Sequence, residues 1–369
     1  MTEFNSADIA AFHDVWVFCE QREGKLMPTD LELVSKGKEL AQELGAKLCG
    51  VLLGGAGIGE QAATLGGYGA DKVLVCESPL LEIYSTDAYT KVLCDLIEQE
   101  KPEAFLVGAS TIGRDLAPRC AARLHTGLCA DCTHLDVDVE KYKQFLREAS
   151  TLNVDGMGWD MEDRNLKMTR PAFGGHLMAT IICPRFRPCM ATVRPGVLKK
   201  GTFDPEKARL VEVVHPEFRL SQEDIRAVSL EVVHAAKKLV NLTEADYIVS
   251  VGRGIGKDPE QGLQLARELA DVLGGVVAGS RAAIEAGWLT PDRQVGQTGQ
   301  TVRPKIYIAL GISGAIQHKA GMQDSGCIVA VNQNEAAPIF EIADYGICAD
   351  LFQVVPQLIA AIRAEKEGA

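Results

Sequence analysis

Val-Gly-Arg-Gly-Ile-Gly at 251–256 and Gly-Ile-Ser-Gly-Ala-Ile-Gln-His at 311–318 decide the fold of the last third of this chain. Each follows a short apolar run, at 246–251 and 305–310, as a turn does at the end of a strand. Glycine lets the backbone turn tightly and approach a ligand closely. A helix start offers free N–H groups that suit phosphate or an electron-rich ring. Two further glycine segments stand nearby, Gly-Ser-Arg-Ala-Ala at 279–283 and Gln-Val-Gly-Gln-Thr-Gly at 294–299. Several such turns in one domain predict a site for a large anionic cofactor.

The sequence around these turns repeats strand and helix patterns to the end of the chain. Strands are predicted at 247–251, 275–278, 305–310 and 327–331. Helices are predicted at 259–273, 281–286, from 315 for a short stretch, and at 351–364. Helical sequence after a glycine turn, repeated in this way, predicts βα units around a parallel sheet.

The first part of the chain has the same alternation of patterns. Strands are predicted at 15–19, 48–53, 72–76 and 104–107, and helices at 31–44 and 86–100, the latter ended by Pro102. The strand runs lack polar alternation, which is typical of a parallel sheet buried on both faces. The predicted fold class is therefore α/β, with two doubly wound domains whose sheets are mainly parallel.

From about residue 129 the pattern changes to short alternating runs, such as 135–139 and 177–183, which predict antiparallel strands. We expect an added sheet or edge region of the first domain here. The stretch 199–236 is more polar, and we place the boundary so that the domains are 1–236 and 237–369.

Composition excludes several classes of function. A chain of 369 residues suggests about two domains. The net charge of −12 and pI near 5.2 argue against nucleic acid or an anionic membrane as a partner. No secretory signal is visible and no apolar run is long enough to span a bilayer. The eleven cysteines are scattered, which indicates reduced thiols and a cytoplasmic location.

Two local patterns resemble binding motifs. Gly-Gly-Ala-Gly-Ile-Gly at 54–59 follows a strand, but it is not the dinucleotide fingerprint GxGxxG, so we interpret it as a strand-to-helix turn. Cys129 and Cys132 form a CxxC pair with His134 nearby. No second ligand pair stands at a convincing spacing, so unligated thiols are the favoured interpretation and no metal is predicted.

Taken together, the glycine segments resemble the FAD-binding domain of electron transfer flavoprotein alpha subunits. The resemblance continues through Ala-Val-Asn (330–332), Ala-Pro-Ile-Phe (337–340), Ala-Asp-Tyr-Gly-Ile (343–347) and Ala-Asp-Leu-Phe (349–352). It is looser in the first two thirds, where it is best at 169–175 and 190–196. The family implies one FAD in this chain and a beta subunit, carrying AMP or a second FAD, that the first domain contacts.

Three residues are implied to tune the flavin rather than to act as acid or base catalysts. A fixed positive charge favours the anionic reduced states of a flavin, and the guanidinium of Arg281 keeps its proton. By resemblance Arg281 lies against the isoalloxazine ring, His318 donates to the C2 carbonyl, and Thr298 faces N5. The alternatives are a surface salt bridge for Arg281, a packing role for His318, and for Thr298 a turn hydroxyl that bonds its own backbone.

The resemblance also implies the other contacts. Arg253 and Ser280 would meet the pyrophosphate, because Arg suits phosphate through bidentate hydrogen bonds. The ring and ribityl contacts would come from Val295, Gly296, Gln297, Ser313, Gly314, Ala315, Ile316 and Gln317. Asn332, Asp350 and Leu351 would hold the ADP half, and Asp350 could equally cap a helix.

The implied function is an electron-transfer subunit. With its beta subunit it would pass electrons between a flavin dehydrogenase, of the acyl-CoA dehydrogenase or reductase type, and other redox partners, with ferredoxin or flavodoxin as further candidates. The second domain would move as a body about the boundary near 237. Segments 84–91, 127–133 and 169–175 are more similar to the anaerobe type, which favours a bifurcating variant that oxidises NADH.

Other interpretations stay open at this point. Arg170 and Arg194 could help to shape a second flavin site, or they could be structural loop arginines. A pyridine-nucleotide-binding dehydrogenase or regulator on a similar α/β domain is the alternative function. A scaffold that has lost its cofactor is a third reading, against which the intact Arg281, Thr298 and His318 argue.

Overall fold

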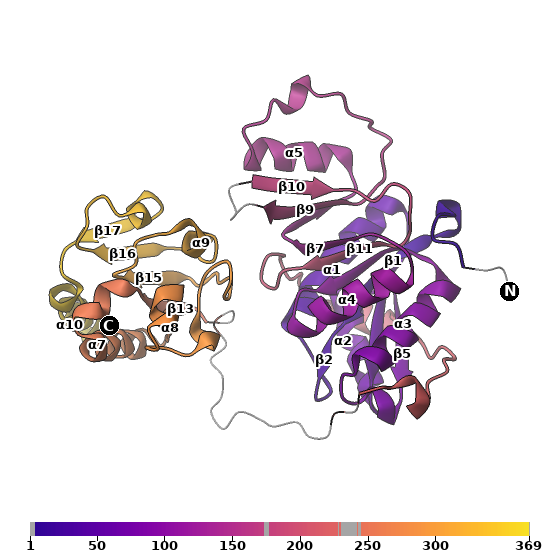
Figure 1. Ribbon diagram of the computed structural model, residues 1–369, viewed down its shortest axis with the longest axis horizontal. Coiled ribbons are helices and arrows are strands. Elements are labelled where there is room, and N and C mark those ends of the chain that lie inside the picture. Colours follow the sequence, from indigo (N-terminus) through magenta and orange to yellow (C-terminus); the bar gives the residue numbers. More distant parts are fainter. Residues whose placement is uncertain (1–3, 173–176, 228, 230–241, 243–244, 369) are drawn as a thin grey trace. The chain divides into compact units, whose positions relative to one another are not determined.

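The computed structural model describes residues 4–172, 177–227, 229, 242 and 245–368 (Figure 1). The chain forms two compact units. Unit 1 comprises Met1–Ala172 and Met178–Val232, and unit 2 comprises Phe173–Leu177 and Val233–Ala369. The predicted boundary after residue 236 falls within 230–241, outside the described residues, and it stays a prediction.

Unit 1 is built on a seven-stranded sheet with the order β12-β5-β4-β1-β6-β11-β7, in which every pair is parallel. Its strands are β1 (His13–Cys19), β4 (Leu48–Gly54), β5 (Lys72–Glu77), β6 (Pro102–Gly108), β7 (Leu128–Cys132), β11 (Cys189–Val193) and β12 (Glu212–Val214). A small hairpin, β2 (Gln21–Arg22) and β3 (Lys25–Leu26), follows β1.

Helices cover both faces of this sheet, as the doubly wound fold predicts. The helices of unit 1 are α1 (Pro28–Leu44), α2 (Ala62–Tyr68), α3 (Thr86–Glu100), α4 (Thr111–Arg123), α5 (Val139–Ala149) and α6 (Pro205–Leu210). Val15 and Val17 of β1 pack in a core with α1 and α2. Trp16 and Phe18, which point to the other face, pack with α3 and α4. Alternate side chains of one strand thus enter two cores, because a strand directs successive side chains to opposite faces.

Local signals explain why the predicted helices have these bounds. Pro28 begins α1 at a position where its missing N–H is not needed, and Gly45 ends the helix in the left-handed conformation with φ 69°. Helix α3 ends at Glu100, because Lys101 adopts the left-handed conformation with φ 50°, and Pro102 begins β6.

A second sheet of unit 1 has the order β10-β9-β8, with strands β8 (His134–Asp136), β9 (Lys167–Ala172) and β10 (Leu177–Ile181). Strands β8 and β9 are antiparallel, which agrees with the expected added sheet. The predicted run 135–139 was too long as a strand: β8 ends at Asp136, and Val139 begins α5 because Asp138 caps that helix through the backbone N–H of Lys141.

Unit 2 is a five-stranded parallel sheet with the order β14-β13-β15-β16-β17. Its strands are β13 (Tyr247–Val251), β14 (Val276–Gly279), β15 (Ile306–Leu310), β16 (Ile328–Asn332) and β17 (Tyr345–Cys348). Its helices are α7 (Pro259–Leu273), α8 (Arg281–Glu285), α9 (Ile316–Lys319) and α10 (Leu351–Gly368). Helices α7 and α10 pack together on one face of the sheet. No helix in the described residues is long and apolar enough to cross a membrane.

Candidate functional site

A cavity of about 550 Å³ lies at the carboxyl ends of the unit 2 strands. In this sheet β14 lies next to β13 on one side, and β15 lies next to β13 on the other side. In open α/β sheets, ligands bind at the carboxyl ends of the strands where the strand order reverses in this way. The turn after β13 and the turn after β15 both border the cavity. The topology therefore points to this cavity as the binding site of unit 2.

The structure brings together twelve of the sixteen site residues predicted from the sequence. They line the cavity, and they are Arg253, Ser280, Arg281, Val295, Gly296, Gln297, Thr298, Ser313, Ala315, Gln317, His318 and Asn332. Gly314, Ile316, Asp350 and Leu351 are not among the residues that line it. Asp350 accepts a hydrogen bond from the backbone N–H of Phe352 at 3.0 Å, so it caps α10, while Leu351 is buried in the core. Contacts of these four residues with a ligand stay predictions.

Two glycine turns approach each other closely at the centre of the site. The backbone N–H of Gly254 donates to the carbonyl of Gly311 at 2.9 Å. A Cβ atom added at Gly254 would lie 2.6 Å from the Cα of Gly311. Such a distance is too short for any side chain, so glycine is required where the turns after β13 and β15 meet.

His318 is the most buried polar residue of the cavity, with 6 % exposure. Its Nε2 lies 2.9 Å from the hydroxyl of Tyr307 in β15. Its Nδ1 is buried and makes no hydrogen bond within the residues that the structure describes. Burial lowers the pKa of His318 to about 4, although the backbone of Val295 acts in the opposite direction. His318 is therefore neutral near pH 7 and holds one unpaired polar atom.

Two arginines supply positive charge to the cavity. Arg281 pairs with Glu285 in the next turn of α8, with Nε 2.7 Å from Oε1, and both side chains are exposed. Arg281 thus forms the surface salt bridge that was its alternative role, and its partner Glu285 lines the same cavity. Arg253 is exposed, and its side chain makes no hydrogen bond or ion pair with the described part of the chain. Its guanidinium is available to an anion.

The turn between Gln294 and Gln300 is tied to α9. The backbone N–H of Gln297 donates to the carbonyl of Gln317 at 2.7 Å, and the side chain of Gln294 donates to the hydroxyl of Thr298 at 2.9 Å. Thr298 therefore keeps its own proton free for a further acceptor. On the other side, the amide of Asn332 donates to the carbonyl of Ile312 at 2.8 Å and fixes the turn after β15.

Sequence reasoning missed three residues whose side chains hold predicted site residues in place. Glu285 and Gln294 line the cavity and hold Arg281 and Thr298, and Tyr307 lies behind His318. A signal for Tyr307 was present, because it is the one side chain with a polar group in the run Ile-Tyr-Ile-Ala-Leu at 306–310. A buried tyrosine hydroxyl usually finds a hydrogen-bond partner.

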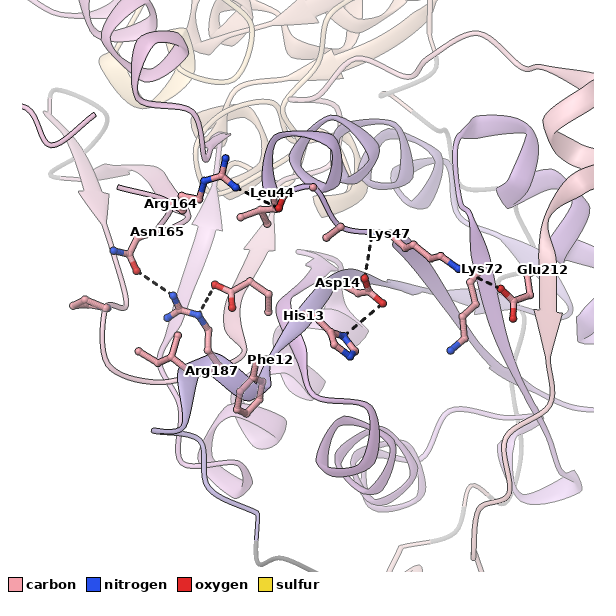
Figure 2. A pocket seen from close by; sticks show the side chains of 15 residues that line it. Phe12, His13, Asp14, Leu44, Lys47, Lys72, Arg164, Asn165, Arg187 and Glu212 are labelled. Atoms are coloured by element: carbon pink, nitrogen blue, oxygen red, sulfur yellow. Dashed lines mark hydrogen bonds and ion pairs between the residues drawn. The ribbon is translucent and has the colours of Figure 1, made fainter. Parts of the chain in front are cut away.

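Unit 1 has a larger cavity of about 940 Å³ (Figure 2). It lies where strands of the sheet begin, and residues from the first positions of β1, β5 and β12 line it. Its cationic side chains are largely paired. Arg187 forms an ion pair with Glu103. The Nζ atom of Lys47 lies 3.8 Å from Oε2 of Glu212, and that of Lys72 lies 3.2 Å from Oε2 of Glu100. Because ligands of such sheets bind at the opposite, carboxyl end, and these cations already have partners, this cavity is the weaker candidate for a cofactor site.

The other unit 1 candidates lie near one another. The carboxylate of Asp131 lies 3.9 Å from Nη2 of Arg194 and 3.0 Å from Nη2 of Arg114. Burial lowers the pKa of Arg194. Arg170 is half-buried in β9. A role of Arg170 and Arg194 at a second flavin stays a prediction.

The thiols of the CxxC pair donate to backbone carbonyls, Cys132 to Cys129 and Cys129 to Met168. His134 is engaged with Asp136 and stacked on Phe145. In the described residues, no group of three or more His, Cys, Asp or Glu side chains could hold a metal ion.

The residues of the unit 2 cavity fit FAD. An isoalloxazine ring presents carbonyl oxygens, and the site offers the buried, unpaired Nδ1 of His318 and the free proton of Thr298. A pyrophosphate is a dianion, and the site offers the guanidinium of Arg253, which has no partner among the described residues, and the hydroxyl of Ser280. The set of donors thus matches both ends of the ligand without any change of protonation.

Comparisons with known proteins agree with this assignment. Residues 15–218 match the model of the electron transfer flavoprotein domain, and residues 241–323 match that of the electron transfer flavoprotein FAD-binding domain. The chain is 64% identical over 366 residues to the acryloyl-CoA reductase electron transfer subunit beta of Anaerotignum propionicum, covering 99% of this chain and 100% of the relative. It is 50% identical to the electron transfer flavoprotein subunit alpha of Thermoanaerobacterium thermosaccharolyticum, covering 96% and 99%, and 45% identical to that of Megasphaera elsdenii, covering 97% and 99%.

Proposed function

This chain belongs to the electron transfer flavoprotein family, in its alpha-subunit branch, and on that premise we propose that it holds one FAD in the unit 2 cavity. The observation that carries the proposal is the unpaired Nδ1 of His318 in a cavity that also contains two guanidinium groups. Bound FAD would supply the electron-transfer chemistry. The chain's own residues would bind it, orient it and set the charge around it.

Each residue has a distinct task in this proposal. His318 would donate a hydrogen bond to a ring carbonyl, where a preorganised donor favours the development of negative charge. Arg281 would supply a permanent positive charge to the flavin. Arg253 and Ser280 would hold the pyrophosphate, and Thr298 would offer its proton to the ring. Asn332, Asp350 and Leu351 would hold the ADP half, and the remaining predicted residues would contact the ring and the ribityl chain.

We propose that the chain works as half of a heterodimer with a beta subunit, which the first domain, 1–236, contacts. The name of the relative from Anaerotignum propionicum refers to acryloyl-CoA reductase. This supports an acyl-CoA dehydrogenase or reductase as the redox partner of the present chain. The second domain, 237–369, would turn about the boundary to present its flavin. Small-angle scattering of the heterodimer with and without the dehydrogenase tests this motion, and identical curves would contradict it.

The finer proposal is that the heterodimer is of the bifurcating type. It would then hold a second FAD in the beta subunit, oxidise NADH, and deliver electrons both to the acyl-CoA enzyme and to ferredoxin or flavodoxin. A simple carrier would instead hold AMP in the beta subunit. Segments 84–91, 127–133 and 169–175, which are more similar to the anaerobe type, support the first form. The name of the relative from Anaerotignum propionicum supports an acyl-CoA reductase as partner in either form.

The test is to co-express the chain with its beta subunit and to count FAD and AMP per heterodimer after extraction. Two FAD and bleaching by NADH are expected. One FAD, one AMP and no reaction with NADH would overturn bifurcation but leave the carrier function. A colourless heterodimer that binds NADH would favour the pyridine-nucleotide alternative and overturn the FAD assignment.

A further inference from the structure

Tyr307 is a buried polar residue that none of the roles above uses. Its side chain is fully buried in the central strand β15, and its neighbours in register are Ile248 of β13 and Ile328 of β16. Within the described residues its hydroxyl has one hydrogen-bond partner, Nε2 of His318 at 2.9 Å. The hydroxyl of Ser250, two residues along β13 from Ile248, is also fully buried and makes no hydrogen bond of normal geometry within the described residues.

The question is which nitrogen of His318 carries the proton. A neutral imidazole has one N–H donor and one lone pair, and the tautomer follows from the hydrogen bonds of the two nitrogens. Burial keeps His318 neutral and also raises the pKa of Tyr307, so the phenol keeps its proton. The pair therefore has two protons to place, one on the phenol and one on the ring.

If Nε2 carried the ring proton, it would donate to Tyr307. The phenol proton would then have only the hydroxyl of Ser250 nearby, which makes no hydrogen bond of normal geometry within the described residues, and the lone pair of Nδ1 would also be unpaired. If Tyr307 donates to Nε2, only the proton on Nδ1 remains without a hydrogen bond of normal geometry within the described residues, and the backbone of Val295 favours a proton there. Buried polar groups are almost always paired, so the arrangement with one unpaired group is favoured over the one with two.

We propose that Tyr307 is a positioning residue that donates to Nε2 of His318 and thereby fixes the imidazole proton on Nδ1, as a hydrogen-bond donor to the flavin carbonyl. This inference rests on the proposed function, because the acceptor is the ring of the bound FAD. The backbone of Val295, which lines the same cavity, favours a protonated nitrogen near it, in agreement with this placement.

The first arm of the test needs no flavin. The chain, ¹⁵N-labelled at histidine and prepared with its beta subunit, is studied by NMR after the flavin has been removed. The chain has seven histidines, and the signals missing in His318→Asn identify the residue. A protonated Nδ1 and an unprotonated Nε2 are expected, and Tyr307→Phe should convert this single tautomer to a mixture. A protonated Nε2 in the unaltered protein would overturn the inference.

The second arm measures the flavin. Tyr307→Phe removes one oxygen and keeps the ring, so the core remains filled. The first one-electron reduction potential of FAD should become more negative by up to about 59 mV, which corresponds to a tenfold change in the equilibrium constant of that reduction. Tyr345→Phe, an identical change at an exposed position of β17, is the matched control and should change nothing.

A double variant separates positioning from structure. In a His318→Asn background, Tyr307→Phe should have no further effect on the potential, because it acts through His318. An equal shift in both backgrounds would show that Tyr307 acts only on the structure and would overturn the inference. If the unaltered protein binds no FAD, the proposed function fails while the NMR arm still decides the tautomer. If it binds FAD and Tyr307→Phe changes neither tautomer nor potential, the inference fails and the function stands.

Discussion

The Nε atom of Arg281 lies 2.7 Å from Oε1 of Glu285, and the two side chains are 68% and 63% exposed. Both residues line the cavity of unit 2. The charge proposed to favour the reduced flavin is therefore partly compensated by a carboxylate on the same short helix. Solvent screens an exposed pair of this kind, so the compensation is incomplete.

Glu285→Gln should raise the first one-electron potential of the bound flavin, because it leaves the charge of Arg281 uncompensated. Exposed ion pairs contribute about 0.2–1 kcal/mol, which corresponds to a shift of roughly 10–40 mV. Spectroelectrochemical titration measures it. Glu365→Gln, at an exposed position of α10, is the control. A lower potential in Glu285→Gln would show that this carboxylate does not oppose Arg281.

Arg281→Ala should weaken FAD binding and lower the flavin potential, since one charge-assisted contact is lost. We expect a dissociation constant about tenfold higher, equivalent to about 1.4 kcal/mol. Fluorescence titration of the flavin-free heterodimer with FAD gives the constant. Arg363→Ala removes an exposed arginine of the same unit outside the cavity and should bind as the unaltered protein does. Equal affinities for all three proteins would exclude Arg281 from the site.

Gly254→Ala should destabilise unit 2 and reduce FAD binding. The added Cβ would lie 2.6 Å from the Cα of Gly311, so one of the two turns must move. We expect a loss of about 1–3 kcal/mol, as is usual for overpacking, measured by urea unfolding. Gly256→Ala is a control in the same turn, because its Cβ would make only an ordinary contact of 3.5 Å with Trp288. Similar losses in both variants would contradict the close approach.

The stability of unit 2 should fall in acid because of His318. The unfolded chain binds a proton at this residue below pH 6.5, whereas the folded chain binds it only below about pH 4. The contribution of neutral His318 to the free energy of unfolding is therefore complete above pH 6.5 and is lost as the pH falls to about 4. This loss in the free energy of unfolding amounts to about 3 kcal/mol. Hydrogen exchange of the peptide that contains β15, followed between pH 7 and 4.5, should show this loss in the unaltered protein and much less of it in His318→Asn. Parallel profiles would mean that the imidazole is not neutralised by burial.

Local patterns predicted much of the fold, since the bounds of α3, α7 and β13 agree with the sequence to the residue. Helix α4 was not predicted. It contains Pro118, which lacks a backbone N–H and normally ends a helix. Strand β11 was also missed, because its place between β6 and β7 depends on pairing with segments far away in the sequence.

Sequence patterns predicted the turns of the candidate site but not the side-chain contacts that support it. Glycine spacing indicated the turns that carry Arg253 and Ser313, and both residues line the cavity. The ion pair of Arg281 with Glu285 and the contact of Tyr307 with His318 depend on side-chain geometry, and a one-dimensional pattern does not contain it.

The position of β11 has a consequence for the newly made chain. Strands β6 and β7 leave the ribosome first, yet they cannot pair with each other, because β11 lies between them in the finished sheet. Until Val193 has been synthesised, the edge of β6 presents unpaired backbone groups, and such an edge invites pairing with another chain. Chaperone demand during translation should therefore be greatest between Cys132 and Cys189 and should fall once β11 has entered the sheet.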